Sequence, residues 1–145
     1  MLIKNITSYA EYLNYESQYK FIIVYITADA CQPCKIIKPK VNNFISVINK
    51  DDIIFLVLKN TVYEKNFEEF DKIFEIEAVP HFAFIENKHL LDSFVSSDFL
   101  FISMKIYNFI KLIENHSIVP KEGSENNDTI IENNDSNASD KTKVD

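Results

Sequence analysis

Apolar and polar residues follow two different periods along the first 116 positions. Two short stretches, Phe21–Thr27 and Ile53–Leu58, are almost continuously apolar and rich in β-branched and aromatic residues, which is typical of strands buried on both faces. Between them, Cys31–Asn49 carries apolar residues at helical spacing, namely Ile36, Ile37, Val41, Phe44, Ile45 and Ile48. Two strands joined by a helix predict a right-handed βαβ unit with a parallel pair. Pro39 lies inside this helix and is expected to kink it, because proline removes one backbone hydrogen bond.

Further elements are predicted on both sides of this unit. An N-terminal strand leads to a helix that Thr7 or Ser8 can cap, and Glu64–Glu75 is an amphipathic helix. Two short strands with a polar gap between them read as a hairpin, and a last helix follows. The expected strands are His81–Ile85 and Leu90–Val95. The last helix should start at Ser96 or Ser97 and carry a core-facing apolar stripe, made of Phe101, Met104, Ile106, Phe109, Ile110 and Ile113. The order β-α-β-α-β-α-β-β-α predicts a mixed sheet with a parallel half and an antiparallel half.

Length and charge narrow the class of protein. A chain of 145 residues suits one domain of ordinary size, and its net charge of −7 disfavours nucleic acid as a partner. No apolar run reaches the roughly 18 residues of a membrane span, so no membrane partner is expected. The N-terminal 20 residues lack the continuous apolar core of a signal peptide. We therefore expect a cytoplasmic protein, in a reducing compartment where a permanent disulfide is unusual.

The composition changes sharply at Ser117. Residues 117–145 contain seven acids, three lysines and no aromatic residue, so they cannot bury enough apolar surface to offset the entropy of ordering. The sequence predicts a domain over residues 1–116 and a disordered, acidic, Asn-rich tail over residues 117–145, which could serve as a partner-binding segment. The single glycine, Gly123, falls in that tail. Any positive backbone φ in the domain should therefore fall on Asn or Asp.

The two cysteines, Cys31 and Cys34, stand two residues apart where a buried strand gives way to a helix. The free N–H groups and positive dipole of a helix N-terminus stabilise a thiolate there, which lowers the pKa of the thiol below its free value of about 8.5. We assign Cys31 as the attacking thiolate and Cys34, one helical turn on, as the resolving thiol. Pro33 suits the first turn of a helix.

Two other interpretations of the cysteine pair remain open at this point. The pair could be vestigial in a fold that is used for binding. It could also ligate zinc or an iron–sulfur cluster, but a zinc site needs about four ligands, and only His81 is expected near the pair within one chain. A metal bridging two chains would supply the missing ligands.

The strand FIIVYIT, the motif CQPCK, Pro39 and the pair Val79-Pro80 just before a strand resemble the thioredoxin family over nearly all of residues 1–116. The resemblance implies a thioredoxin fold, an α/β structure with a central mixed sheet flanked by helices on both faces. It implies a thiol–disulfide oxidoreductase whose Cys31/Cys34 dithiol reduces or exchanges protein disulfides, with a reductase or glutathione as electron donor. No bound cofactor is needed, because the sulfurs carry the chemistry. The family's cis-proline maps to Pro80, and substrate contacts are expected at Ala30, Gln32, Pro33, Val79, Pro80 and His81.

The sequence also departs from the family's pattern near the motif. Ala30 stands where the family usually has Trp, and Tyr25 stands where a buried acid accepts the proton of the second cysteine. A phenol with a pKa near 10 is a poor base at neutral pH, so release of substrate by Cys34 should be slow. The glycine after the hairpin corresponds to about Ser96, and His81 replaces Thr, where it could stabilise a thiolate or stay neutral. The alternative is therefore a catalytically weak interaction or scaffold protein, for example in a cytoskeletal or multiprotein assembly.

Overall fold

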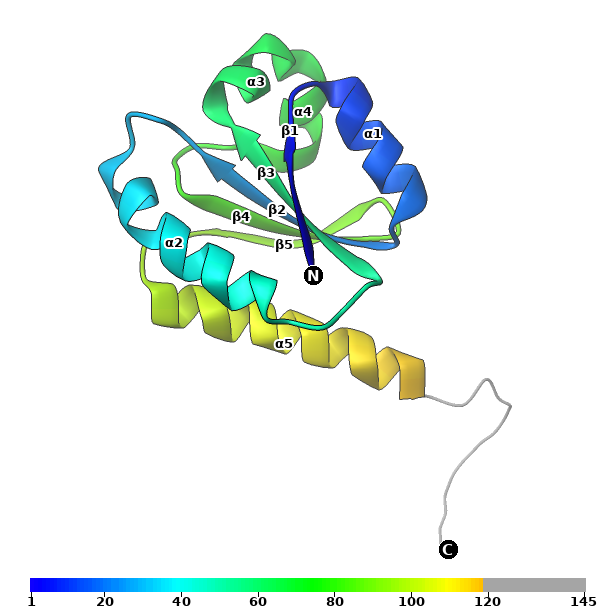
Figure 1. Cartoon of the computed structure of the whole chain (residues 1–145). Helices are drawn as coiled ribbons and strands as arrows, with labels where there is room; N and C mark the ends of the chain where they lie inside the picture. Colours follow the sequence, from blue (N-terminus) through cyan, green and yellow to red (C-terminus); the bar gives the residue numbers. More distant parts are fainter. Residues whose placement is uncertain (119–145) are drawn as a thin grey trace, which may run out of the picture. The chain divides into compact units, whose positions relative to one another are not determined.

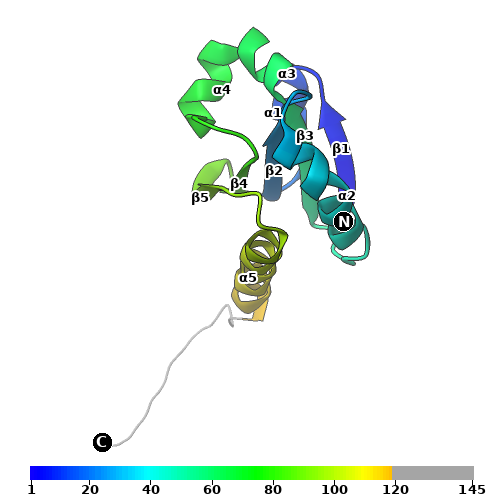
Figure 2. The same ribbon diagram turned by 90° about the vertical axis from the view of Figure 1, so that its left-hand side faces the viewer.

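The computed structural model describes residues 1–118 of the chain, and in this part a five-stranded sheet has the order β1-β3-β2-β4-β5 (Figure 1). The strands are β1 (Leu2–Ile6), β2 (Phe21–Thr27), β3 (Ile53–Lys59), β4 (His81–Glu86) and β5 (His89–Val95). The helices are α1 (Tyr9–Gln18), α2 (Gln32–Ser46), α3 (Asn60–Lys65), α4 (Phe67–Phe74) and α5 (Phe99–Ile118). β1, β3 and β2 are parallel, whereas β4 and β5 are antiparallel to their neighbours. The mixed sheet predicted from the sequence is confirmed, with β1 and β5 at its two edges (Figure 2).

The chain forms two compact units that divide within α5. The first unit is Met1–Lys105, and the second begins at Ile106. In its described part the second unit is a helical segment, in which Lys111 Nζ lies 3.4 Å from Glu114 Oε1 and over the ring of Tyr107. Among residues 1–118, no helix combines the length and the apolar composition that a bilayer crossing needs. Of the predicted tail, residues 117 and 118 end α5, and residues 119–145 lie outside the described residues.

One face of the sheet carries a cluster of buried apolar side chains. Alternate residues of β2, β3 and β4 meet aromatic side chains from α1, α3 and α4 on this face. The buried members of the cluster are Ile6, Tyr12, Ile22, Val24, Ile26, Ile54, Leu56, Leu58, Tyr63, Phe70, Phe74, Ala83 and Ile85. The rings of Tyr12 and Phe70 pack edge to face at 5.9 Å, which is a favoured geometry for aromatic pairs. The continuous apolar runs of β2 and β3 are therefore buried on both faces, as predicted.

The opposite face carries a row of paired residues that crosses all five strands. The register aligns Asn5, Val57, Tyr25, Phe82 and Phe94 in that order. Tyr25 stacks on Phe82 with ring centroids 4.7 Å apart, and Phe82 stacks on Phe94 at 5.3 Å. This row puts Tyr25 into an aromatic stack.

The helix α2 buries only part of the apolar stripe that the sequence predicts. Ile37, Val41 and Ile45 are buried, whereas Ile36 is 56% exposed. The helix ends at Ser46, three residues before the predicted end at Asn49, and Val47 caps it. Ile36 precedes Ile37 by one residue, which turns it about 100° away from the buried stripe.

The start of α1 confirms its predicted cap. Ser8 is the N-cap, and its Oγ accepts a hydrogen bond from Glu11 N at 3.1 Å. Glu11 Oε1 in turn accepts from Thr7 N at 2.7 Å. The two bonds satisfy backbone donors that a helix start otherwise leaves unpaired.

Two predicted helices are wrong in their extent. The expected helix Glu64–Glu75 is two helices, because Asn66 leaves the helical region (φ −121°, ψ 38°) and its Nδ2 donates to Val62 O at 2.9 Å. The last helix begins at Phe99 instead of Ser96 or Ser97. Asp98 is its cap, since Asp98 Oδ1 accepts from Leu100 N at 3.0 Å. Asparagine and aspartate favour such positions because their side chains bond to nearby backbone groups.

The hairpin between β4 and β5 is confirmed, with Asn87 and Lys88 as its two turn residues. Both have positive φ, at 51° and 71°, as the mirror-image turns that suit twisted strands require. Glu75, which ends α4, also has a positive φ of 49°. The expectation that Asn or Asp fills such positions is right at Asn87 and wrong at Lys88 and Glu75.

In the last helix, the predicted stripe is buried at Ile106, Phe109, Ile110 and Ile113. It is not buried at Phe101 and Met104, which are 38% and 50% exposed. Phe101 makes an edge-to-face contact with Phe94 at 5.5 Å.

Candidate active site at the cysteine pair

A short turn carries the chain from the end of β2 at Thr27 into α2. Cys31 N donates to Ala28 O at 3.1 Å, which closes this turn. Cys31 is the N-cap of α2 with an extended backbone, and Lys35 N donates to Cys31 O at 3.2 Å as the first helical bond. Pro33 stands in the first helical turn, where a missing N–H costs nothing. The sequence thus places Cys31 where the positive end of the helix dipole acts.

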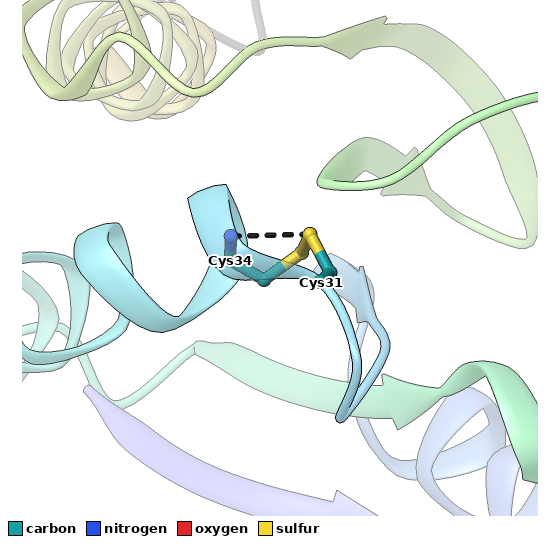
Figure 3. The surroundings of a disulfide bond; sticks show 2 residues. All are labelled: Cys31 and Cys34. Carbon is teal, nitrogen blue, oxygen red and sulfur yellow. Dashed lines mark hydrogen bonds between the residues drawn. A yellow bond between two sulfur atoms is a disulfide. The ribbon is translucent and has the colours of Figure 1, made fainter.

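The two cysteines form a disulfide, with their Cα atoms 5.2 Å apart (Figure 3). Cys34 N donates a hydrogen bond to Cys31 Sγ at 3.1 Å, so the backbone of the first turn already points a donor at this sulfur. The two sulfurs differ in access, since Cys31 is partly exposed and Cys34 is only 2% exposed. A donor aimed at the accessible sulfur is what a nucleophilic thiolate at position 31 requires.

The peptide bond between Val79 and Pro80 is cis, as expected from the resemblance. β4 begins at the next residue, and its His81 pairs with Ile26 near the end of β2. Pro80 therefore lies at the same end of the sheet as the turn that carries Cys31. Pro80 is buried, and its carbonyl oxygen accepts from Ser96 N at 3.2 Å. The structure thus brings the predicted proline and the predicted cysteine pair to the same end of the sheet.

A cavity of about 520 Å³ lies on the α2 side of the sheet and has Cys34 in its wall. Its lining comes from the three parallel strands and from one side of α2. The residues are Ile3, Asn5, Tyr25, Thr27, Ala28, Asp29, Cys34, Lys35, Lys38, Asn42, Val57 and Lys59. Asp29 Oδ1 lies 3.2 Å from Lys59 Nζ, and this ion pair is exposed. The sequence analysis found only Tyr25 and Cys34 among these residues, although the helical spacing of Lys35, Lys38 and Asn42 could have indicated a polar side of α2.

The comparison with family models decides the family. A model described as thioredoxin matches residues 2–100. The chain belongs to the thioredoxin family. The comparison with curated proteins finds no match.

Solved thioredoxin structures share this fold. An oxidised thioredoxin from Plasmodium falciparum is 21% identical, with a TM-score of 0.62, over 74% of this chain and 97% of that one. Mitochondrial thioredoxin 3 from Saccharomyces cerevisiae is 20% identical, with a TM-score of 0.60, over 73% and 94%. A complex of ferredoxin:thioredoxin reductase with thioredoxin f2 contains a chain 14% identical, with a TM-score of 0.62, over 75% and 96%. The thioredoxin fold expected from the sequence is confirmed.

Tyr25, which the sequence motif matches to the family's buried acid, lines the same cavity as Cys34. Tyr25 is 1% exposed, and burial raises the pKa of its hydroxyl, while the Thr27 side chain opposes part of the rise. Even so, the Tyr25 hydroxyl makes no hydrogen bond of acceptable geometry within the described part of the chain. A raised pKa leaves even less of the phenolate form that could accept a proton at neutral pH, so Tyr25 does not take the proton of Cys34 there.

His81 follows the cis-proline of this thioredoxin domain and is 5% exposed. Burial lowers the pKa of its imidazole, and neither ring nitrogen has a hydrogen-bond partner among residues 1–118. Its strand partner is Ile26, so its side chain belongs to the face opposite Tyr25. The geometry favours a neutral His81 over a charged group that supports a thiolate.

The other expected contact residues frame the disulfide of this thioredoxin domain. Ala30, Gln32 and Pro33 are exposed beside it, and Val79 is half-buried. Because Ala30 has only a methyl group, it leaves Cys31 less covered than an indole at that position would. Among residues 1–118, no three His, Cys, Asp or Glu side chains gather closely enough to hold a metal ion.

Proposed function

We propose that the protein is a thiol–disulfide oxidoreductase that reduces or exchanges protein disulfides through Cys31 and Cys34. Family membership and a cysteine pair at disulfide distance support thiol–disulfide chemistry in general. The hydrogen bond from Cys34 N to Cys31 Sγ is the observation that carries the assignment of roles. It stabilises negative charge on the more exposed sulfur, which is the one a protein substrate can reach.

The proposed reaction has two steps. The Cys31 thiolate attacks one sulfur of a substrate disulfide, forms a mixed disulfide, and expels the other substrate sulfur as a thiolate. The Cys34 thiolate then attacks Cys31 Sγ, which forms the Cys31–Cys34 disulfide seen in the structure and releases the second substrate sulfur. The substrate gains two electrons, and the protein loses them. A second dithiol or two molecules of glutathione must return these electrons.

We further propose that the substrate backbone lies between the cysteine turn and the cis-proline, at the end of the sheet where both are found. Ala30, Gln32 and Pro33 would contact it from one side, and Val79, Pro80 and His81 from the other. The exposure of the first three residues and the register between Ile26 and His81 support this placement. A thioredoxin of similar fold is known in complex with ferredoxin:thioredoxin reductase, which supports a reductase as the electron donor. A chain whose two cysteines both lie in one redox motif suits a reducing compartment such as the cytoplasm.

The test is reduction of insulin disulfides by the full-length protein with dithiothreitol as electron source. Cys31→Ser should abolish the acceleration, because it removes the attacking sulfur. Cys34→Ser should instead trap a covalent mixed disulfide that is visible on a non-reducing gel. Catalysis is not the role of the pair if wild type is no faster than either variant.

The release step should limit turnover, because no carboxylate among residues 1–118 is buried where it could take the proton of Cys34. The only carboxylate that lines its cavity is Asp29, which is 79% exposed and paired with Lys59. Rapid acid quenching during turnover should therefore show wild-type protein accumulating as the mixed disulfide. Accumulation of the free dithiol instead would place the slow step before attack.

The second candidate function is a catalytically weak interaction or scaffold module, and Tyr25 is the observation that favours it. Its aromatic stack with Phe82 fills a position where catalysis by the family normally uses an acid. Retention of partner proteins by the Cys31→Ser/Cys34→Ser double variant, at the level of wild type, would favour this second function. Loss of those partners would favour the oxidoreductase.

A further inference from the structure

The cavity beside Cys34 differs in charge from the chain as a whole. The chain has a net charge of −7, yet the cavity is lined by three lysines, Lys35, Lys38 and Lys59, and by one carboxylate, Asp29. Asp29 Oδ1 forms an ion pair with Lys59 Nζ at 3.2 Å, so the charges of Lys35 and Lys38 remain as an excess of two positive charges in the cavity lining. Such a focused positive field inside an acidic protein raises the local concentration of small anions.

The lining is arranged as a polar rim around an apolar floor. Lys35, Lys38 and Asn42 follow one another at intervals of three and four residues, so they share one side of α2. Thr27 and Lys59 are register partners at the ends of β2 and β3, and they close the rim from the sheet. Tyr25 and Val57, also register partners, form part of the floor. The rim supplies ammonium, amide and hydroxyl donors, with a single carboxylate as acceptor.

We propose that this cavity binds a small dianion, a molecule with two carboxylates or one phosphoryl group. Two of the lysines, Lys35 and Lys38, approach from α2, while Lys59 approaches from the sheet, so the charges surround the ligand from two sides. The volume of about 520 Å³ lies in the range of small-molecule sites and holds a ligand of that size. A polyanion such as a nucleic acid would meet the acidic remainder of the surface.

The proposal does not depend on the redox activity, because binding needs neither a reduced thiol nor a protein substrate. It is therefore tested on the oxidised, full-length protein. Sodium phosphate, succinate and acetate are titrated at constant ionic strength, and binding is followed by backbone amide shifts in nitrogen-15 spectra. Phosphate and succinate separate the two sources of a dianion, and acetate controls for single charge.

We expect at least one of the two dianions to saturate with a Kd below about 1 mM, with shifts centred on Asn5, Asn42 and Val57, and acetate to bind far more weakly. Lys38→Ala should weaken binding about tenfold, because it removes one hydrogen bond to a charged ligand. Lys40→Ala is the matched control, since Lys40 is exposed on the same helix but does not line the cavity. Asp29→Asn should tighten binding about twofold by removing the only negative charge of the rim.

The proposal fails if neither dianion saturates below about 10 mM, or if Lys38→Ala and Lys40→Ala weaken binding equally. Equal effects would mean a general attraction of anions to the lysines of α2. Shifts confined to residues 31–34 would also overturn it, because they would place the anion on the helix N-terminus and not in the cavity. Asp29→Asn should gain affinity, a result that a partly unfolded variant cannot mimic.

Discussion

The Tyr25 hydroxyl gives the sharpest test of how the site is built. Tyr25 is 1% exposed, and its hydroxyl has no hydrogen-bond partner of acceptable geometry among the described residues. An unsatisfied buried polar group costs about 1–3 kcal/mol. The side chain of Thr27 acts on the hydroxyl and reduces this cost, so we take the lower end of the range. Tyr25→Phe keeps the ring that stacks on Phe82 and removes only the hydroxyl, so it should raise the free energy of unfolding by about 1 kcal/mol.

The matched control is Tyr63→Phe, for which the opposite sign is expected. Tyr63 is 3% exposed, its hydroxyl donates to Asp71 Oδ1 at 2.7 Å, and it accepts from Ile76 N at 3.3 Å. Removing that hydroxyl deprives Asp71 and Ile76 of these hydrogen bonds, so the free energy of unfolding of the variant should fall by about 1–2 kcal/mol.

Urea unfolding of both variants and wild type measures the comparison, with equal m-values as the check on two-state behaviour. If Tyr25→Phe destabilises the protein as much as Tyr63→Phe does, the Tyr25 hydroxyl has a partner and the reasoning is wrong.

Two further predictions concern the hairpin and the buried imidazole. Lys88 has a φ of 71°, a conformation that costs a residue with a Cβ about 1–2 kcal/mol and costs glycine less. Glycine also gains more entropy in the unfolded chain, which offsets part of this difference. Lys88→Gly should therefore raise the free energy of unfolding by about 0.5–1 kcal/mol. A decrease in the urea midpoint would contradict this turn geometry. Burial lowers the pKa of His81 from its usual value of 6.5. Below that pH the unfolded chain therefore binds more protons than the folded one, so the free energy of unfolding should fall as the pH drops below about 6.5. His81→Leu should flatten this acid-side slope in unfolding curves taken between pH 7 and pH 5, and an unchanged slope would mean that His81 is already charged in the folded protein.

Much of the fold could be predicted because the signals were local. β2 and β3 are continuous apolar runs bounded by polar residues, and only a strand between two layers needs such a run. The Ser8 cap and the two-residue turn are also local, since each depends on residues within four positions of one another. The order of the elements followed from these patterns, whereas the cis-proline rested on the resemblance to the family.

The errors arose where local signals conflict. Asn66 interrupts an apolar stripe whose period continues through α3 and α4, so periodicity alone joined the two helices. Ser96, Ser97 and Asp98 are all acceptable caps by residue type, and only the backbone path after β5 selects Asp98. Glu75 and Lys88 adopt a positive φ because the termini of α4 and of the hairpin impose it, in a domain that has no glycine to offer.

The candidate site likewise contains some residues that local patterns predict and others that only the fold brings together. The cysteine pair and Pro80 belong to a motif and could be found by reading along the chain. The cavity could not, because Asn5, Thr27, Lys38 and Lys59 come from four different elements and meet only when three parallel strands and α2 assemble. No spacing within the sequence indicates that these residues lie close together.

The aromatic row explains why the sheet accepts a tyrosine at position 25. An acid at position 25 would face Phe82 on one side and Val57 on the other, with no cation among its register partners. Burying a carboxylate in this row costs hydration, whereas a tyrosine ring gains from stacking at 4.7 Å. The identity of residue 25 is therefore tied to the apolar character of its row and not to Cys34 alone. Replacing Tyr25 with an acid would then destabilise the sheet before it could help the second sulfur lose its proton. Cys34 lines the lysine-bordered cavity, so the solvent of that cavity offers its thiol a route for losing a proton.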